Sequence, residues 1–368
     1  MPKNITIDLR LWSASGIGKY LQNIVPSVIE EFKDINFTLL GNKKSLSAIN
    51  WPSNVIAINA FNSKIYSIEE QYKALKVIPK NCDLLWWPHW NIPIFYKGKI
   101  ITTIYDAFHL RIPVNFKNFF KNIYTRLLFN FVRKKSLLTF TLSNFSKTEL
   151  TELTKINPKN IHITNLAVDK EWFNFQPDRN KIDPIHPYIV YVGNVKPHKN
   201  LITLVESYIK ILDKVEHNLL IIGKKEGFIS GDKVVQKYAN LYPDRIKFTG
   251  WIEDIDVRNY VANADLMVFP TLYEGFGIPP LEAMACGCPV LVSDIAVTRE
   301  VCSDAAIFFD PNNSEELSKS IINILSNSDH RNKMLSKGVE RSKYFSWESS
   351  ANKTIFRLSQ LFLEMSKK

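Results

Sequence analysis

The sequence predicts an α/β protein with two Rossmann-like domains, whose parallel sheets face each other across a cleft. Short apolar segments alternate with helical segments along the chain, which is typical of parallel sheets covered by helices. A length of 368 residues suits two domains of about 150–190 residues better than one core. The strand–helix pattern also restarts after a proline-containing polar stretch at 178–187, where we place the linker.

Six strands are expected in the first half of the chain. They are 5–9, 37–41, 55–58, 83–87, 100–105 and 137–142. A glycine turn and a helix near 20–32 follow the first of them. Parallel sheets bind ligands at the carboxyl ends of their strands, so the polar residues after these strands are candidate site residues.

Six further strands are expected in the second half. They are 188–193, 219–223, 246–250, 266–270, 290–293 and 306–309. A last amphipathic helix is expected over 347–363. We therefore expect an N-terminal domain at 1–180, a C-terminal domain at 181–345, and a terminal helix in 346–368 that packs back on the N-terminal domain.

Charge divides unevenly between the halves. Residues 1–180 hold 24 Lys and Arg against 13 Asp and Glu, whereas residues 181–368 hold 23 of each kind. The whole formal charge of +11 therefore lies on the first half, which indicates that this half faces an anionic partner. The four cysteines lack the spacing of a zinc site, so we expect small buried residues in a reducing compartment.

The segment 269–285 is the most informative in the chain. A buried strand ends there, Glu274 follows, and Gly275-Phe276-Gly277 forms a tight turn before a helix. Glycines let backbone amides approach a ligand, and the N-terminus of a helix attracts an anion. Glu274 and Glu282 are spaced to hold hydroxyl groups at opposite ends of one ligand.

These residues resemble a known family, the retaining glycosyltransferases of family 4, which have the GT-B fold. The family motif Glu-x7-Glu is matched by Glu274 and Glu282, and its flanking blocks Glu-Gly-Phe-Gly, Pro-x-Leu-Glu-Ala-Met-Ala and Gly-x-Pro-Val are all present. The resemblance implies a catalytic Glu274 beside the donor hexose and a Glu282 that binds the ribose hydroxyls. It also assigns Gly275, Phe276 and Gly277 to donor binding.

Two glycine turns extend the resemblance. In Gly193–Asn200 the family carries an arginine and a lysine that hold the donor diphosphate. Lys199 falls on the lysine, but Asn194 stands where the arginine is usual and is expected only to donate a hydrogen bond. After Asp8-Leu9-Arg10, the Gly16-Ile17-Gly18 turn resembles one whose amides face the diphosphate. Gly250, at the end of a predicted strand, is also assigned to donor binding.

Candidate catalytic residues of the first half follow two predicted strands. The loop around His89 resembles a family loop that bears a histidine near the transferred sugar. The segment 105–109 resembles the family His-Asp segment, with Asp106 and His109 as candidates, but Tyr105 stands where histidine is common. Packing of either histidine within its loop is the alternative.

No metal or other cofactor is expected, only a nucleotide-diphosphate sugar as co-substrate. Asp254 and Asp256 match the Asp-x-Asp pattern of metal-dependent transferases, yet the helical residues that follow indicate a helix start. The charge of the leaving group would then be neutralised by Lys199, turn amides and helix dipoles.

Residues 107–148 contain no acidic residue and combine basic with aromatic side chains. A basic helix with an aromatic face can lie on anionic lipid. The residues assigned to such a membrane or acceptor surface are Lys117, Lys121, Arg126, Arg133 and Lys134. The alternative is that the aromatic residues pack under the sheet while the lysines face water.

The resemblance, to mannosyl- or rhamnosyltransferase-like enzymes, implies a retaining hexosyltransferase that moves a hexose or deoxyhexose in the synthesis of bacterial surface polysaccharide, such as O-antigen or capsule. Its donor would be a nucleotide sugar, and its acceptor a saccharide or a polyprenyl-diphosphate-linked saccharide. With no apolar run long enough to span a bilayer, we expect a cytoplasmic protein peripheral to the inner face of the membrane. The other possibilities are a different GT-B enzyme (a phosphorylase or an epimerase) and a nucleic-acid-binding protein.

Overall fold

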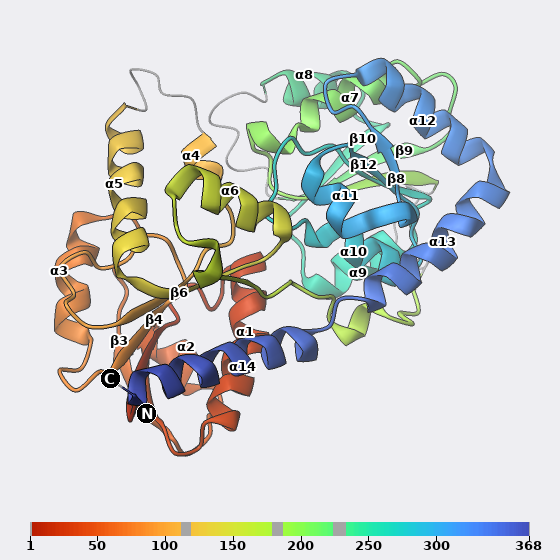
Figure 1. The fold of residues 1–368 in the computed structure, drawn as a ribbon. Helices are drawn as coiled ribbons and strands as arrows, with labels where there is room; N and C mark the ends of the chain where they lie inside the picture. Colours follow the sequence, from red (N-terminus) through yellow and green to blue (C-terminus); the bar gives the residue numbers. More distant parts are fainter. Residues whose placement is uncertain (1, 112–118, 179–186, 224–232, 368) are drawn as a thin grey trace. The chain divides into compact units, whose positions relative to one another are not determined.

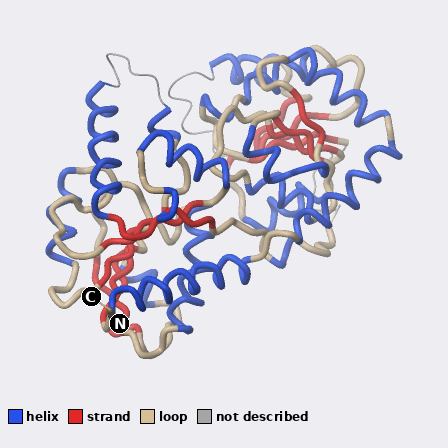
Figure 2. The backbone as a smooth tube through the Cα atoms, in the orientation of Figure 1, coloured by secondary structure: helices blue, strands red, loops and turns tan. Residues whose placement is uncertain are grey.

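The computed structural model describes residues 2–111, 119–178, 187–223 and 233–367 (Figure 1). The chain divides into two compact units. Unit 1 comprises Met1–Leu166 and Ser346–Lys368, and unit 2 comprises Ala167–Phe345. Each unit holds one parallel sheet with helices around it (Figure 2).

The sheet of unit 1 has seven strands in the order β3-β2-β1-β4-β5-β6-β7, all paired in parallel. The strands are β1 (Asn4–Asp8), β2 (Asn36–Gly41), β3 (Val55–Ala60), β4 (Leu84–Trp87), β5 (Ile100–Thr103), β6 (Ser136–Thr141) and β7 (Ile161–Ile163). Central strands such as β4 are buried along their whole length, as expected for a sheet covered on both faces.

The helices of unit 1 join successive strands, except the last, which comes from the end of the chain. They are α1 (Gly16–Glu31), α2 (Lys43–Ser47), α3 (Ile68–Val77), α4 (Phe108–Arg111), α5 (Phe119–Lys135), α6 (Asn144–Thr154) and α14 (Trp347–Ser366). Helix α14 packs against α1, where the rings of Phe32 and Phe362 lie 5.0 Å apart.

The sheet of unit 2 has six parallel strands in the order β10-β9-β8-β11-β12-β13. The strands are β8 (Tyr188–Val192), β9 (Asn218–Ile222), β10 (Ile246–Gly250), β11 (Leu266–Phe269), β12 (Val290–Ser293) and β13 (Ile307–Phe309). The α-helices are α7 (Leu201–Ile209), α8 (Lys233–Leu241), α9 (Asp254–Ala262), α10 (Ile278–Ala285), α11 (Ala296–Cys302), α12 (Ser314–Ser326) and α13 (Ser328–Lys343).

The structure differs from the sequence-based expectation in two places. The units divide at Leu166 and Ala167, before the expected boundary at 180 and 181. Of the expected linker at 178–187, residues 179–186 lie outside the described part of the chain. The expectation also omitted β7, a three-residue edge strand too short to show alternation.

Across the described ranges, no helix is long and apolar enough to cross a membrane. Asp254 begins α9, in agreement with a helix start at the Asp-x-Asp pattern.

The two glycines at the start of α1 have different surroundings. A Cβ atom on Gly18 would lie 2.5 Å from the backbone oxygen of Trp12, closer than any real contact of this kind. A Cβ atom on Gly16 would meet nothing within 4 Å. Only Gly18 is therefore required by packing.

We predict that Gly18→Ala lowers the stability of the protein by about 1–3 kcal/mol, because the turn at Trp12 must shift. Gly16→Ala is the matched control and should be neutral or stabilise by up to about 1 kcal/mol, because alanine favours a helix. Chemical denaturation of both variants checks this. Equal stabilities would contradict the steric argument.

Candidate functional site

Lys199 and Glu274 form an ion pair in unit 2, with the Nζ of Lys199 against the Oε1 of Glu274. Their side chains are 20% and 14% exposed, so the pair is partly shielded from solvent but reachable. The Nζ of Lys199 also lies 6.0 Å from the centre of the Phe269 ring. The structure thus brings together two residues that the sequence assigned to the donor site from separate motifs.

Hydrogen bonds to one backbone carbonyl hold together the two loops that carry Lys199 and Glu274. The 3₁₀ turn Pro197–Lys199 follows β8, and residues 271–274 follow β11. The carbonyl oxygen of His198 accepts hydrogen bonds from the N–H of Leu272 at 2.8 Å and from the Oγ1 of Thr271 at 3.1 Å. Because β8 and β11 are neighbours in the sheet, their following loops meet at one edge.

Helix α10 starts directly beyond this pair. Its N-cap residue is Gly277, whose φ of 91° is a conformation that favours glycine. Proline follows inside the first turn, where its missing N–H costs nothing. Glu282 is 7% exposed and projects from this helix. Of the first four residues of α10, Ile278 and Leu281 carry a backbone N–H, whereas Pro279 and Pro280 have none. Glu274 precedes the helix, and Glu282 is its fifth residue.

The other predicted donor residues occupy varied positions. Gly250 ends β10 with a φ of 73°, and its carbonyl accepts the N–H of Gly223 at 3.2 Å. Asn194 is exposed after β8. Gly275 is buried. Phe276 is 2% exposed and packs edge-on to Phe345 at 5.3 Å, so its side chain is part of the interior. Gly16 and Gly18 lie in unit 1, in the first turn of α1.

In unit 1, Tyr66 bridges the two candidate histidines. Its Oη lies 3.2 Å from the Nε2 of His89 and 3.4 Å from the Nε2 of His109. The Nδ1 of His89 accepts the backbone N–H of Asn91 at 3.0 Å. Burial, with smaller effects of His109 and Arg10, lowers the pKa of His89 to about 3, so His89 is neutral at physiological pH.

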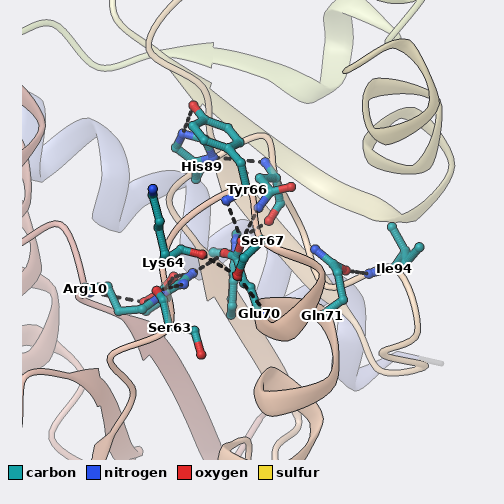
Figure 3. A network of polar contacts seen from close by, with 12 residues as sticks. Arg10, Ser63, Lys64, Tyr66, Ser67, Glu70, Gln71, His89 and Ile94 are labelled. Atoms are coloured by element: carbon teal, nitrogen blue, oxygen red, sulfur yellow. Dashed lines mark hydrogen bonds and ion pairs between the residues drawn. The ribbon is translucent and has the colours of Figure 1, made fainter. Parts of the chain in front are cut away.

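Beside this chain of contacts, a buried guanidinium is held by two carboxylates (Figure 3). Arg10, whose side chain is 6% exposed, pairs with Asp8 at 2.7 Å and with Glu70 at 2.6 Å. Its guanidinium lies 4.0 Å from the centre of the Phe61 ring and 4.8 Å from that of Trp87. Burial lowers the pKa of Arg10, but the two carboxylates outweigh it and leave this pKa above its ordinary value.

Glu70 connects the guanidinium to the tyrosine. One carboxylate oxygen faces Arg10, and the other accepts the backbone N–H of Tyr66 at 2.9 Å and the side-chain amide of Asn91. Burial raises the pKa of Glu70, and the charge of Arg10 opposes that shift. We call Asp8, Arg10, Glu70 and Asn91 the Arg10–Glu70 network.

Asp106 follows β5 as predicted, whereas Tyr105, expected as the last residue of that strand, lies two residues beyond its end. One oxygen of Asp106 accepts the N–H of Phe108 at 3.0 Å and so caps the turn into α4. The hydroxyl of Tyr105 is buried and has no hydrogen-bond partner among the residues that the structure describes, and burial raises its pKa well above the ordinary value. The ring of Tyr105 packs edge-on to Tyr20, 5.7 Å away.

Sequence reasoning missed Tyr66, Glu70 and Asn91. Ser67-x-x-Glu70 has the spacing of a capping box, and the hydroxyl of Ser67 accepts the N–H of Glu70 at 3.1 Å. That signal indicates the start of α3 but not a buried acid. Tyr66, with a φ of 69°, lies in a loop whose pattern predicts nothing.

Helix α5 carries the predicted basic surface. Arg126, Arg133 and Lys134 are exposed, whereas Lys117 and the side chain of Lys121 lie outside the described residues. Three apolar side chains on α5 are also largely exposed: Phe119 by 47%, Ile123 by 50% and Leu127 by 46%. Their spacing of four residues places them along one stripe of the helix.

The alternative, that aromatic residues of this region pack in the interior, holds for part of it. Phe129 is 2% exposed and stacks on Trp90 at 5.3 Å. Lys135 donates to the carbonyl oxygens of Ile94 and Tyr96, so its charge is committed within the unit.

Acidification should destabilise the protein through His89. A histidine with a folded pKa of about 3 and an ordinary value of 6.5 is protonated first in the unfolded chain. Its contribution is complete above pH 6.5 and is lost as the pH falls towards 3, costing about 2 kcal/mol at pH 5. Denaturation of His89→Gln and wild type at pH 7 and pH 5 measures this. Identical losses in the two proteins would contradict a neutral buried His89.

No group of three or more His, Cys, Asp or Glu that could hold a metal ion occurs among the residues the structure describes.

Comparison with known proteins agrees with this architecture. Residues 173–341 match the family of glycosyl transferases group 1. O-antigen chain mannosyltransferase B of Escherichia coli is 29% identical over 230 residues, which cover 59% of each chain and so less than two thirds of that relative. O-antigen chain mannosyltransferase RfbU of Salmonella typhimurium is 26% identical, over 75% of this chain and 74% of its own.

The fold is shared with solved structures. The structure of Anabaena Alr3699/HepE in complex with UDP and glucose matches with a TM-score of 0.77 at 15% identity, over 97% of this chain and 100% of its own. Its likeness shows the fold alone. Residues 173–341 thus match glycosyl transferases group 1, within a chain whose two parallel sheets have the GT-B fold.

Proposed function

We propose that this chain transfers a mannosyl group from a nucleoside-diphosphate sugar to a saccharide acceptor, with retention of anomeric configuration. The observation that carries the proposal is the Lys199–Glu274 pair at the start of α10, with Glu282 on that helix. The sugar is inferred from the two relatives, which are named as O-antigen chain mannosyltransferases.

The pair supplies the opposite charges that a nucleotide sugar needs. Lys199 offers a positive charge for the diphosphate, and the carboxylate of Glu274 accepts hydroxyl groups of the hexose. Glu282 would accept the ribose hydroxyls. Each charge of the pair compensates the other in a partly buried place.

Leaving-group stabilisation is assigned to fixed groups of the protein and not to a metal. As the bond from sugar to diphosphate breaks, negative charge grows on the phosphate oxygens. Lys199 and the backbone N–H of Ile278, the first residue of α10, would stabilise that charge without rearranging. Asn194, where the family has an arginine, leaves Lys199 with a larger share of this task.

We assign the acceptor to unit 1, where the histidines and Asp106 follow the ends of β4 and β5. A lipid-linked acceptor suits the exposed face of α5, with its apolar stripe and its basic residues Arg126, Arg133 and Lys134. Such a face fits an anionic membrane surface, consistent with peripheral attachment and a role in O-antigen synthesis.

Lys199→Ala should weaken donor binding by about tenfold to a hundredfold, because the diphosphate loses its cation and Glu274 is left unpaired. Lys196→Ala removes an exposed lysine three residues earlier and is the control, expected to bind as wild type. Calorimetric titration with guanosine- and uridine-diphosphate hexoses, with and without EDTA, measures both. Unchanged affinity for Lys199→Ala, or dependence of binding on a metal, would contradict the proposal.

Replacing Arg126, Arg133 and Lys134 together by Glu should abolish flotation with vesicles that contain anionic lipid, since each basic residue contributes about 1 kcal/mol near such a surface. Replacing Lys33, Lys43 and Lys44 by Glu makes the same change in net charge at exposed positions on other elements. This control should still float at low salt. Equal flotation of the two variants would reject α5 as the membrane surface.

A further inference from the structure

Tyr66 is an exposed aromatic residue in an otherwise buried polar cluster. It is 44% exposed, whereas His89 is 8% exposed and Trp90 5%. Its ring centre lies 5.0 Å from that of Trp90, 5.3 Å from that of His89 and 5.7 Å from that of His109. Three rings thus support one ring that water, or a ligand, can reach.

The backbone of Tyr66 adopts a conformation that a tyrosine avoids. Its φ of 69° lies in the left-handed region, where a bulky residue is strained. Such strain persists only when the surrounding contacts fix it. Here one carboxylate oxygen of Glu70 accepts the N–H of Tyr66 at 2.9 Å, and the other pairs with Arg10 (Figure 3). The side-chain amide of Asn91 donates to the same oxygen as the N–H of Tyr66.

The hydroxyl of Tyr66 also has a defined orientation. Because the N–H of Asn91 donates to the Nδ1 of His89, the proton of the neutral ring is on Nε2, which donates to the Oη of Tyr66. The Oη–H can then donate to the Nε2 of His109. One lone pair of Oη remains for a hydroxyl of a ligand.

A tyrosine that only packed in the interior would not need a strained backbone, three supporting rings and an oriented hydroxyl. A pyranose ring presents C–H groups on one face, which suit the electron-rich face of an aromatic ring, and hydroxyl groups at its rim. Tyr66 offers an aromatic face for the C–H groups and a hydroxyl for the rim of the sugar. Its neighbours His89 and His109 are the residues that the sequence assigned to the reaction.

We propose that Tyr66 binds the acceptor saccharide by stacking and by its Oη, and that Glu70 is the positioning residue that holds Tyr66 in its strained conformation. This rests on the proposed function for the identity of the acceptor. It adds a specificity-determining residue in unit 1 that no sequence motif marked.

Binding of an α-linked mannotriose to the full chain tests this without requiring turnover. We expect Tyr66→Ala to weaken mannotriose binding at least tenfold and Tyr66→Phe about threefold, as measured by calorimetry or saturation-transfer NMR. Glu70→Gln should also weaken it, while all three variants bind nucleoside diphosphate as wild type. The control variants are Tyr72→Ala and Glu69→Gln, which alter an exposed tyrosine and an exposed acid on α3, the helix that carries Glu70. Both controls should bind mannotriose normally.

Two results would overturn the inference: mannotriose binding by Tyr66→Ala within twofold of wild type, or no mannotriose binding by wild type. Loss of nucleotide binding together with saccharide binding in Tyr66→Ala would indicate a general structural role and would also overturn it. Failure of wild type to bind any nucleotide sugar would contradict the proposed function instead. Failure of the proposed function can therefore be distinguished from failure of the inference about Tyr66.

Discussion

Parallel pairing of every strand is the constraint on which the sites of this protein depend. In each sheet all strands run in the same direction, so their carboxyl ends lie at one edge. Asp8 is the last residue of a strand of unit 1, and His89 and Asp106 follow strands of the same sheet. Lys199 and Glu274 follow strands of unit 2. Residues far apart in the sequence are thereby brought within bonding distance, as in the pair of Lys199 with Glu274. The backbone bonds between His198 and the loop after β11 then fix the details.

Buried charge is handled differently in the two units. In unit 1 the guanidinium of Arg10 is surrounded by carboxylates and aromatic rings, and Glu70 is satisfied by three donors. Removing one member of this cluster would leave a buried charge without a partner, so the cluster acts as a rigid support. In unit 2 the Lys199–Glu274 pair is partly exposed, so a ligand can exchange with one partner. The first arrangement suits positioning, and the second suits binding.

The sequence predicted the parts of this structure that follow from local rules. Apolar segments with polar ends marked all the strands but β7, and Gly277 and the prolines after it marked the start of α10. The motif around Glu274 predicts a donor site, and its spacing matches the strand, turn and helix observed there. The contacts of Phe276 were less predictable: the resemblance assigned it to donor binding, whereas its side chain is buried and packs against Phe345.

What the sequence could not predict depends on contacts between distant segments. Arg10 and Glu70 are 60 residues apart, and nothing in either local pattern indicates that they pair. Tyr66 takes part through a backbone conformation that no local preference favours. The spacing of Ser67 and Glu70 indicates a helix start, but it gives no sign that the carboxylate of Glu70 accepts the N–H of Tyr66 in the loop before the helix.

The anomeric configuration of the product tests the central claim most directly. The purified chain would be incubated with nucleoside-diphosphate α-mannose and a mannoside acceptor, and the carbon–proton coupling at the new anomeric centre measured by NMR. We predict an α-linked product and an equimolar amount of released nucleoside diphosphate. A β-linked product, or release of the nucleotide without any glycoside across a panel of sugars and acceptors, would contradict it.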